Sequence, residues 1–396
     1  MASSSSSSGG LLSSISYTHD GSFLLAASGH VVKLFSAATG AQVRTLAAHT
    51  ASVTAVAHSP TAILQAYSAA LDGRVILWDL DEAAPLRTIC VGLPILSMVL
   101  DPTRPETAFI LTGAVPAAGS AAATAMETPS YCREIAAVGR VYTLPLRISE
   151  QQAAWASAHA AKAAAKDGGV DSGGAFGSLT RPWPAELTKL FTAKGAKGLA
   201  AGTCGGTMSI VGALTGRTLK LHDVGNGTTS DFNQRREMSC VAVSPTEPLV
   251  AAGDESGHIY LLRVESRCAP TPTPKKAKKS HQQEEGGDKP PPGTPQAKPI
   301  SRASDMHWHA QRVGALEFSH DGGYLYSVGK EGVLVAWQLN SGHQSFLPRL
   351  GAPLTQLACS PTGTSAAVLG LDNAVRLIDL AANQVRRTVH GLLQAA

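Results

Sequence analysis

Three side chains in the first quarter of the sequence have the types needed for nucleophilic catalysis. His49, Ser68 and Asp72 supply an imidazole, a hydroxyl and a carboxylate, and Trp78 follows them closely. An imidazole that takes the serine proton, oriented by a carboxylate, would activate the hydroxyl as in a hydrolase. The same groups also suit a structural role, because a buried indole N–H, hydroxyl or imidazole requires a hydrogen-bond partner. Whether the role is catalytic or structural depends on the secondary-structure elements that carry these residues.

The arrangement of these four residues resembles the WD-repeat pattern, with Ala48-His49 where Gly-His is usual. In that family the histidine, the serine, the turn aspartate and the tryptophan form a hydrogen-bonded relay within one blade of a propeller. The resemblance therefore implies a structural role and not catalysis. A second copy of the pattern stands at His309, Ser327, Glu331 and Trp337. Its glutamate replaces the turn aspartate, which predicts a strained or incomplete relay.

Two further clusters give weaker signals of chemistry. His307 and His309 would lie on one face of a strand, as metal ligands could, but no third ligand stands at metal spacing. The Gly-rich segment 202–206 falls in a hairpin position and does not open a helix, so it does not indicate a phosphate loop. We expect no catalytic residue, no cofactor, no metal and no small-molecule substrate.

A cationic run is the other distinctive feature, and it comprises Lys275, Lys276, Lys278 and Lys279. Between Glu265 and Ala303 there are eight Lys/Arg and four Asp/Glu. The net charge of this segment is therefore +4, which equals the formal net charge of the whole chain. The surrounding segment is rich in proline and cannot bury apolar surface, so we expect it to be disordered. Such a lysine cluster fits recognition by nuclear import receptors or contact with RNA phosphate.

The composition excludes several classes of protein. The chain has 396 residues, of which 44% are hydrophobic and 16% charged, so it can bury a sizeable core. No apolar run approaches the roughly 20 residues of a membrane-spanning helix, so we expect no membrane partner. Six cysteines occur without a Cys-x-x-Cys pair, which argues against a disulfide framework or a zinc site and favours a reducing compartment.

The elements that carry these residues recur along the chain. Short apolar stretches end in a turn, followed by a strand, a Gly or Asn hairpin and another alternating strand. The turns stand at His19, Pro60, Pro102, Pro245, His320 and Pro361. Three of their intervals are 41, 42 and 41 residues, the length of a four-stranded propeller blade. With a further unit at Leu190–Leu221, whose turn is Lys194-Gly195, the sequence predicts an all-β, seven-bladed WD-repeat β-propeller.

Insertions and a tail account for the remaining residues. We expect a disordered Ser-rich tail over residues 1–12 and the propeller over 13–392. Within it, residues 148–182 form an insertion that begins with a short Ala-rich helix over Ile148–Gly168, and residues 265–303 form the disordered basic loop. Each unit has four strands of its own, so we expect the ring to close without an N-terminal strand entering the last blade.

The C-terminal units resemble a more specific family. His307–Trp337, followed by Ser345–Gly351 (SFLPRLG), is similar to the WD repeat-containing protein 75 family, called U-three-associated protein seventeen in fungi. The resemblance spans residues 14–392 and is strongest after His307. The family has two tandem propellers and a helical C-terminal region, whereas this sequence ends at Ala396 after one propeller.

The resemblance implies a function in ribosome biogenesis. The family belongs to the nucleolar t-UTP (UtpA) subcomplex, which binds the 5′ external transcribed spacer of pre-ribosomal RNA. It assembles the small-subunit processome with the U-three snoRNP, supports transcription of ribosomal DNA by RNA polymerase I and has no enzymatic activity. The expected partners are therefore other UtpA subunits, the 5′ external transcribed spacer of pre-ribosomal RNA and the U-three snoRNP. The expected location is the nucleus, within the nucleolus.

Two other functions remain open from the sequence. A propeller that recruits substrates to a ubiquitin ligase would usually have an arginine two positions after Trp78-Asp79, and position 81 is an aspartate. An enzyme built on a propeller would need polar residues that converge on the central channel. The innermost predicted strands, such as 53–60 and 354–361, are mainly apolar.

Overall fold

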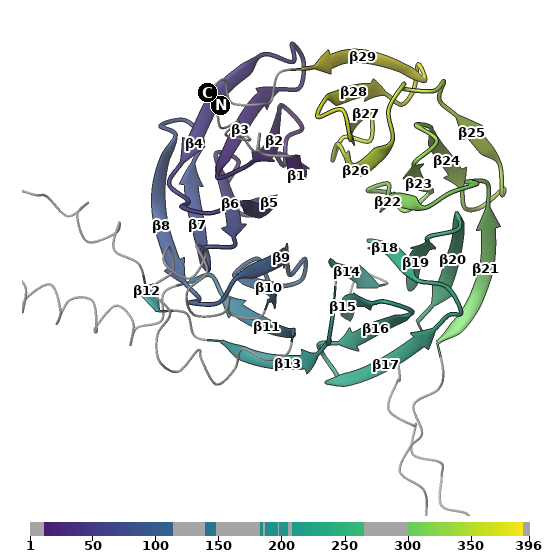
Figure 1. Cartoon of the computed structure of the whole chain (residues 1–396), viewed down its shortest axis with the longest axis horizontal. Helices are drawn as coiled ribbons and strands as arrows, with labels where there is room; N and C mark the ends of the chain where they lie inside the picture. The colour runs from purple at the N-terminus through teal and green to yellow at the C-terminus, as the bar shows by residue number, and fades with distance from the viewer. Residues whose placement is uncertain are drawn as a thin grey trace, which may run out of the picture.

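A ring of seven sheets surrounds a central channel (Figure 1). The computed structural model describes residues 12–113, 139–147, 183–184, 187–196, 198–204, 208–264 and 300–390. Every regular element in those residues is a strand, which confirms the predicted all-β, seven-bladed propeller. No helix within the described ranges has the length and apolar character needed to cross a membrane. The helix expected over Ile148–Gly168 and the lysines of the basic segment lie outside these ranges.

The first three blades use the N-terminal half of the chain. Blade 1 comprises β1 (Leu12–Tyr17), β2 (Phe23–Ser28), β3 (Val31–Ser36) and β4 (Gln42–Ala47). Blade 2 comprises β5 (Val53–His58), β6 (Gln65–Ala70), β7 (Arg74–Asp79), β8 (Ala84–Cys90) and, at its outer edge, β12 (Trp183–Pro184). Blade 3 comprises β9 (Ile95–Leu100), β10 (Thr107–Thr112), β11 (Arg140–Pro145) and β13 (Thr188–Thr192).

The other four blades follow in chain order. Blade 4 comprises β14 (Gly198–Cys204), β15 (Met208–Thr215), β16 (Thr218–Asp223) and β17 (Thr228–Asn233). Blade 5 comprises β18 (Met238–Val243), β19 (Leu249–Asp254), β20 (His258–Arg263) and β21 (Ser301–His307). Blade 6 comprises β22 (Val313–Phe318), β23 (Tyr324–Gly329), β24 (Leu334–Gln338) and β25 (Gln344–Phe346). Blade 7 comprises β26 (Leu354–Cys359), β27 (Ser365–Gly370), β28 (Val375–Asp379) and β29 (Gln384–Val389).

The hairpins between the second and third strands have the backbone geometry that the sequence predicted. In six blades a residue with positive φ occupies this turn, and these residues are Gly29, Gly73, Gly216, Gly257, Gly332 and Asn373. Glycine adopts positive φ without a steric penalty, and asparagine tolerates it better than other residues. The turn residues therefore fix the register of the alternating strands that follow.

The hydrophobic core lies between blades rather than within one blade. Each of seven buried clusters contains side chains from two adjacent sheets. Between blades 1 and 2, for example, Leu25 and Leu34 pack with Ile76 and Trp78. Small residues on the second strands, such as Ala26 and Ala69, are fully buried and let neighbouring blades approach near the channel. Because every blade buries both faces, each contributes to the stability of its two neighbours.

The ring closes by side-chain packing between blades 7 and 1. β1 pairs with β2 of its own blade, with Leu12 opposite Ser28, and β29 pairs with β28. Across the junction, Ile15 and Leu24 pack with Leu369 and Leu377. The expectation that no N-terminal strand enters the last blade is therefore confirmed for the described strands.

Three features of the blade assignment differ from the sequence prediction. Leu190 lies on β13, whose backbone bonds complete blade 3, so the predicted unit Leu190–Leu221 was wrong at its start. Lys194-Gly195 joins blades 3 and 4 rather than the first two strands of a blade. β12 was not predicted, and it pairs in parallel with β8.

The boundaries of two predicted disordered segments also need correction. The basic loop was expected to reach residue 303, but Ser301 and Arg302 pair with Arg263 and Leu262 in the ladder between β20 and β21. The N-terminal tail was expected to include residue 12, but Leu12 begins β1. In both cases the neighbouring strand offers unpaired backbone groups, which an adjacent residue satisfies by extending the ladder.

The connections of each blade alternate between two faces of the ring, because neighbouring strands are antiparallel. We call one of them the relay face. It carries the connections between second and third strands and those between blades, including His49, Asp72, His309 and Glu331. The first-to-second and third-to-fourth connections lie on the opposite face.

Candidate functional site

The structure brings together the four predicted residues of blade 2. The Ser68 hydroxyl oxygen lies 2.7 Å from His49 Nε2 and accepts the indole N–H of Trp78, also at 2.7 Å. On the other side of the imidazole ring, the Nδ1 atom of His49 lies 2.9 Å from Asp72 Oδ2. Asp72 further accepts the backbone N–H groups of Thr50 and Arg74, both at 3.0 Å.

One assignment of protons satisfies every polar group of this relay. Trp78 donates to Ser68, Ser68 donates to His49 Nε2, and His49 Nδ1–H donates to Asp72, which requires a neutral imidazole and an ionised carboxylate. Burial acts to raise the pKa of Asp72, but the hydrogen bonds from His49, Thr50 and Arg74 outweigh it and hold that pKa below its usual value. The relay thus ties the connection between blades 1 and 2 to strands β6 and β7.

The second copy was predicted to be strained or incomplete, and in blade 6 it forms every contact of the relay, so it is not incomplete. Ser327 Oγ lies 2.9 Å from His309 Nε2 and accepts the indole N–H of Trp337 at 2.9 Å. Glu331 Oε2 lies 3.2 Å from His309 Nδ1, and Oε1 accepts the backbone N–H of Gln311. The longer glutamate divides its two oxygens between the imidazole and the backbone, where Asp72 uses Oδ2 for both. Burial lowers the pKa of His309 despite the nearby carboxylate, which favours the neutral imidazole.

The hydrogen bonds of both relays follow the order of a catalytic triad, but their surroundings do not suit catalysis. Ser68 is 1% exposed and Ser327 is 0% exposed. Each hydroxyl oxygen already accepts an indole N–H, and none of the relay residues lines either channel cavity. A substrate carbonyl therefore has no path to either oxygen, whereas acyl transfer requires contact with the nucleophile.

Two other blades stabilise the same turn with different side chains, which the sequence interpretation did not identify. In blade 7, Asp372 forms an ion pair with Arg376, whose guanidinium Nη1 lies 3.1 Å from Oδ1. In blade 5, Asp254 accepts the Tyr260 hydroxyl at 2.8 Å. Both partners lie on the third strand next to the turn, so each blade satisfies its turn carboxylate locally.

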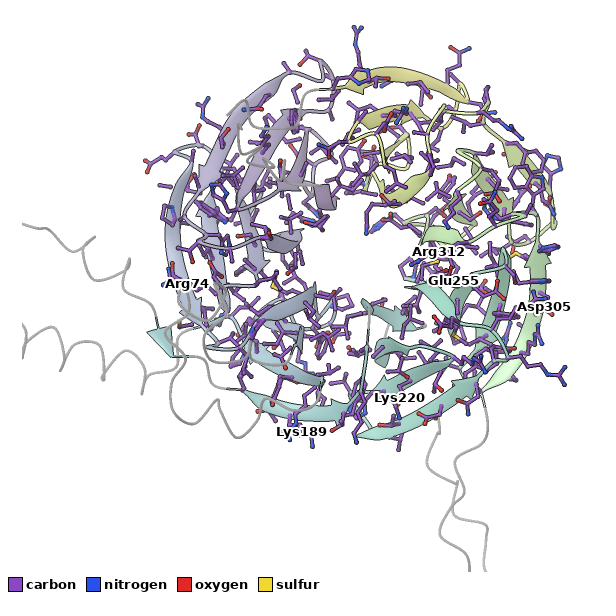
Figure 2. All side chains as sticks on the ribbon, viewed as in Figure 1. Arg74, Lys189, Lys220, Glu255, Asp305 and Arg312 are labelled. Atoms are coloured by element: carbon purple, nitrogen blue, oxygen red, sulfur yellow. The ribbon has the colours of Figure 1, made fainter. Side chains whose placement is uncertain are left out.

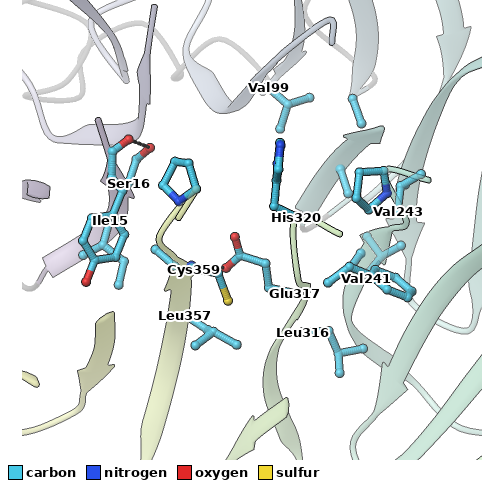
Figure 3. A pocket seen from close by; sticks show the side chains of 18 of the residues that line it. Ile15, Ser16, Val99, Val241, Val243, Leu316, Glu317, His320, Leu357 and Cys359 are labelled. Atoms are coloured by element: carbon cyan, nitrogen blue, oxygen red, sulfur yellow. Dashed lines mark hydrogen bonds between the residues drawn. The ribbon is translucent and has the colours of Figure 1, made fainter. Parts of the chain in front are cut away.

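A half-buried carboxylate that the sequence interpretation missed lines the channel. A cavity of about 460 Å³, shown in Figure 3, is lined mainly by apolar inner-strand residues and contains Glu317 as its only acidic residue. Glu317 Oε2 accepts the backbone N–H of Cys359 at 3.0 Å. Burial raises the pKa of Glu317 to about 8, so the protonated acid is present near neutral pH. Glu317 stands three positions before the turn residue His320, and the residues three positions before the turn residues at 19, 60, 102, 245 and 361 are Ala, Ser or Val, which is the only sequence signal for this site.

The polar groups of the channel do not assemble into a metal or catalytic centre. Burial, and next the charge of Glu317, raise the pKa of the Cys359 thiol well above its usual value, which keeps it from being a nucleophile. His58 and His320 line the same cavity. Within the described residues, no group of three or more His, Cys, Asp or Glu side chains could hold a metal ion. The described residues that line the channel therefore do not form a metal site or an activated nucleophile.

The lysine cluster predicted from the sequence is separate from both relays along the chain. Lys275, Lys276, Lys278 and Lys279 lie outside the described residues. The segment that contains them leaves the ring after Val264 and returns at Ile300, on the connection between β20 and β21. That connection belongs to the opposite face.

Comparisons with known proteins agree with this architecture. A family model for the first β-propeller of WD repeat-containing protein 75 matches residues 16–152 and 298–373. The chain is 25% identical over 380 residues to WD repeat-containing protein 75 of Danio rerio, covering 95% of this chain and 37% of that protein. It is 43% identical over 79 residues to U3 small nucleolar RNA-associated protein 17 of Schizosaccharomyces pombe, covering 19% of this chain and 10% of that protein.

Among solved structures, the β-propeller domain of Cps50 (Swd1) from Myceliophteria thermophila matches with a TM-score of 0.59. The sequence identity is 12%, and the match covers 93% of this chain and 96% of that chain. At this identity the likeness shows the fold alone. The chain spans little more than a third of the length of its Danio rerio relative, with 37% covered.

Proposed function

This chain belongs to the WD repeat-containing protein 75 family, and from that premise we propose that it is a non-catalytic scaffold in ribosome biogenesis. In this proposal it acts in the nucleolus as a subunit of the t-UTP (UtpA) subcomplex. It helps to bind the 5′ external transcribed spacer of pre-ribosomal RNA and to assemble the small-subunit processome with the U-three snoRNP. Support for transcription by RNA polymerase I is part of the same proposal.

The observation that carries the proposal is the family match over six of the seven blades. The matched residues 16–152 and 298–373 include strands of blades 1 to 3 and 5 to 7. A scaffold is also consistent with the buried hydroxyls of Ser68 and Ser327, since the ring then supplies rigid surfaces instead of a reactive group. Binding of partners would be distributed over the connections on both faces.

The lysine cluster supports a nuclear location and a contact with nucleic acid. Lys275, Lys276, Lys278 and Lys279 form a compact basic run of the kind that import receptors recognise. The same charges attract RNA phosphate, and such attraction weakens at higher salt because the release of condensed counterions on binding is then less favourable. In this proposal the cluster delivers the propeller to the nucleus and contributes to its affinity for RNA.

Affinity purification of the tagged chain from cells tests the proposed function. We expect UtpA subunits and RNA of the 5′ external transcribed spacer to co-purify, measured by mass spectrometry and by sequencing of crosslinked RNA. Recovery of a ubiquitin ligase core without pre-ribosomal RNA would instead identify a substrate receptor. Recovery of neither, at wild-type expression, would refute the scaffold function for this chain.

A further inference from the structure

The charged residues of the propeller are distributed unequally between its two faces. On the relay face, the described connections carry seven Lys/Arg and five Asp/Glu, of which Asp72 and Glu331 belong to the relays. On the opposite face, the described connections carry two Lys/Arg and seven Asp/Glu. The near-neutral total charge of the folded ring therefore conceals a polarity between its two faces.

Most of the positive charge on the relay face lies on blades 4, 5 and 6. We call this set the basic arc, and its members are Arg217, Arg235, Arg236, Arg312, Lys330 and Arg349. Arg312 is half-buried, and the other five residues are exposed. In the same three blades, the described connections on the opposite face contain Glu247 and Asp321 and no Lys or Arg.

Hydrogen bonds between successive connections make the basic arc one continuous strip. The backbone bonds are Gln234 N–H to Arg217 O at 2.9 Å, Glu255 N–H to Glu237 O at 3.0 Å, Lys330 N–H to Arg312 O at 3.4 Å and Leu350 N–H to Gly332 O at 2.7 Å. The Arg236 guanidinium also donates to the Ser256 hydroxyl. The cations of three blades are thus held in a fixed order along the rim.

The connections that carry the basic arc also contain Glu237, Glu255 and Glu331, so three carboxylates accompany its six cations and the net formal charge is +3. Glu255 pairs with Arg312, with Oε1 and Nη1 3.1 Å apart, in the part of the ring nearer the channel (Figure 2). The two carboxylate oxygens of Glu331 already contact His309 Nδ1 and the backbone N–H of Gln311. Within the described part of the chain, no ion-pair partner stands beside Arg217, Arg235, Lys330 or Arg349.

Aromatic and imidazole rings adjoin the same strip. The rings of His258 and His307 stack with their centroids 4.0 Å apart, and the rings of Trp308 and Phe346 lie 4.9 Å apart. Trp308 and Phe346 directly precede or begin the connections that carry Arg312 and Arg349. Burial, and then the charges of His307 and Arg236, lower the pKa of His258, so its ring is neutral at neutral pH.

We propose that the basic arc and its adjoining rings bind single-stranded RNA on the relay face of blades 4 to 6. Exposed cations in a row can contact successive phosphates, and flat rings beside them can stack on unpaired bases, which together recognise single strands without a fixed sequence. An acidic peptide would use the charges and leave the rings unused, so RNA fits the whole surface better. The assignment rests on the proposed function and gives it a specific surface.

Fluorescence anisotropy with a labelled single-stranded RNA of about 20 mixed-sequence nucleotides tests this assignment. The arc variant changes Arg217, Arg235, Lys330 and Arg349 to Ala. The matched control changes Arg44, Lys189, Arg263 and Arg387 to Ala, four exposed cations on strands β4, β13, β20 and β29. Lys189 stands at the outer rim, away from Arg312 (Figure 2). Both variants have the same net charge, and both keep the lysine cluster, so a difference between them reports position and not total charge.

We expect the arc variant to bind at least about tenfold more weakly and to show a smaller salt dependence of log K, while the control changes affinity by less than about threefold. Trp308→Leu keeps an apolar side chain but removes the ring, and should weaken binding by about 5- to 50-fold. Equal thermal unfolding midpoints of all variants would show that the propeller remains folded.

Equal RNA affinity of the arc and control variants would overturn the assignment. So would retained RNA binding together with loss of a processome protein from the arc variant, since the arc would then be a protein surface. Absence of RNA binding by the wild-type chain would also overturn the arc, but the scaffold function would stand if UtpA subunits still co-purified. Loss of those subunits from the wild-type chain would refute the proposed function itself.

Discussion

Burial determines what the Ser68 hydroxyl can do. Its oxygen lies 2.7 Å from both an imidazole nitrogen and an indole nitrogen, and the side chain is excluded from solvent. A nucleophile must be reachable, so the same hydrogen bonds that would activate a serine at a surface instead join strands β6 and β7, the turn between them and the connection from blade 1. The relay is therefore a stabilising feature of blade 2.

Removal of this hydroxyl should destabilise the propeller. Ser68→Ala leaves the Trp78 N–H and His49 Nε2 buried without a partner, and we expect the free energy of unfolding to fall by about 1–3 kcal/mol. Chemical denaturation measures this change. Ser345→Ala, at an exposed position on β25, should change it by less than about 0.5 kcal/mol. Equal effects of the two substitutions would contradict a structural relay.

Glu317 should make the stability depend on pH in the direction opposite to an ion-paired carboxylate. Its pKa in the folded chain is raised to about 8, so the folded state holds the proton more tightly than the unfolded state. Stability is then lost as the pH rises from the unfolded pKa through the folded one. Between about pH 6 and pH 9, unfolding of the wild type should become easier by about 1–2 kcal/mol relative to Glu317→Gln.

Glu317→Gln is a suitable comparison because the amide oxygen can still accept the Cys359 N–H. The Cys359 thiol, whose pKa is also raised in the folded chain, is present in both proteins, so the comparison isolates the contribution of Glu317. Denaturation curves collected across this pH range give the difference directly. Parallel pH profiles of the two proteins would show that Glu317 is ionised in the folded chain.

The sequence identified the residues of both relays, but it predicted neither the completeness of the blade 6 relay nor the channel carboxylate. His49, Ser68, Asp72 and Trp78 occur in one repeat at a spacing that implies a shared blade, and their contacts are local to adjacent strands. Glu317 contacts the Cys359 backbone because β22 lies beside β26 of the next blade, and no pattern within its own strand encodes that approach. A contact across blades becomes visible only when the ring is assembled.

At the scale of the elements, Gly257 controls how closely blades 5 and 6 approach on the relay face. Its φ is +89°, and a Cβ at this position would lie 1.8 Å from the carbonyl oxygen of His309. Two backbones therefore meet where no other side chain fits. The turn of blade 5 is packed directly against the connection that holds the second relay.

Gly257→Ala should consequently cost more than an ordinary substitution at positive φ. We expect a loss of at least about 3 kcal/mol, because strain at positive φ and a steric clash add together. Gly195→Ala is the matched control, since φ there is +69° and nothing lies within 4 Å of its Cβ. It should cost about 1 kcal/mol. Similar unfolding midpoints for the two variants would mean that the relay-face connections can separate without cost.

The elements were predictable where strands alternate and turns contain Gly or Asn, and less so around the insertions. The six positive-φ turns follow from residue type, because few residues tolerate that geometry. The assignment of β13 to blade 3 could not be obtained this way. Thr188–Thr192 has no turn signal that links it to β11, and it completes that sheet through backbone bonds after a long insertion. Such pairing depends on the open edge that blade 3 presents.

The whole ring combines a closed, apolar framework with two faces of different charge. Seven clusters between blades make stability a property of the closed ring, since each cluster needs both of its neighbouring sheets. Charge at the connections adds little to that stability but determines which face attracts a polyanion. The framework can therefore stay constant while each face serves a different partner.

The segment that carries the lysine cluster should be separable from this framework. Arg263 and Ser301 are register partners at the end of the ladder between β20 and β21, so a short turn is sufficient to connect them. Deletion of Pro270–Pro299 should leave the unfolding midpoint unchanged and reduce nuclear accumulation, measured as the nuclear-to-cytoplasmic ratio of a fluorescent fusion. Substitution of Lys275, Lys276, Lys278 and Lys279 by Gln keeps the segment length and should reduce the ratio equally. Unchanged nucleolar localisation of both proteins would assign nuclear import to another part of the chain. If only the deletion lost nuclear accumulation, import would depend on the length of the segment rather than on its charge.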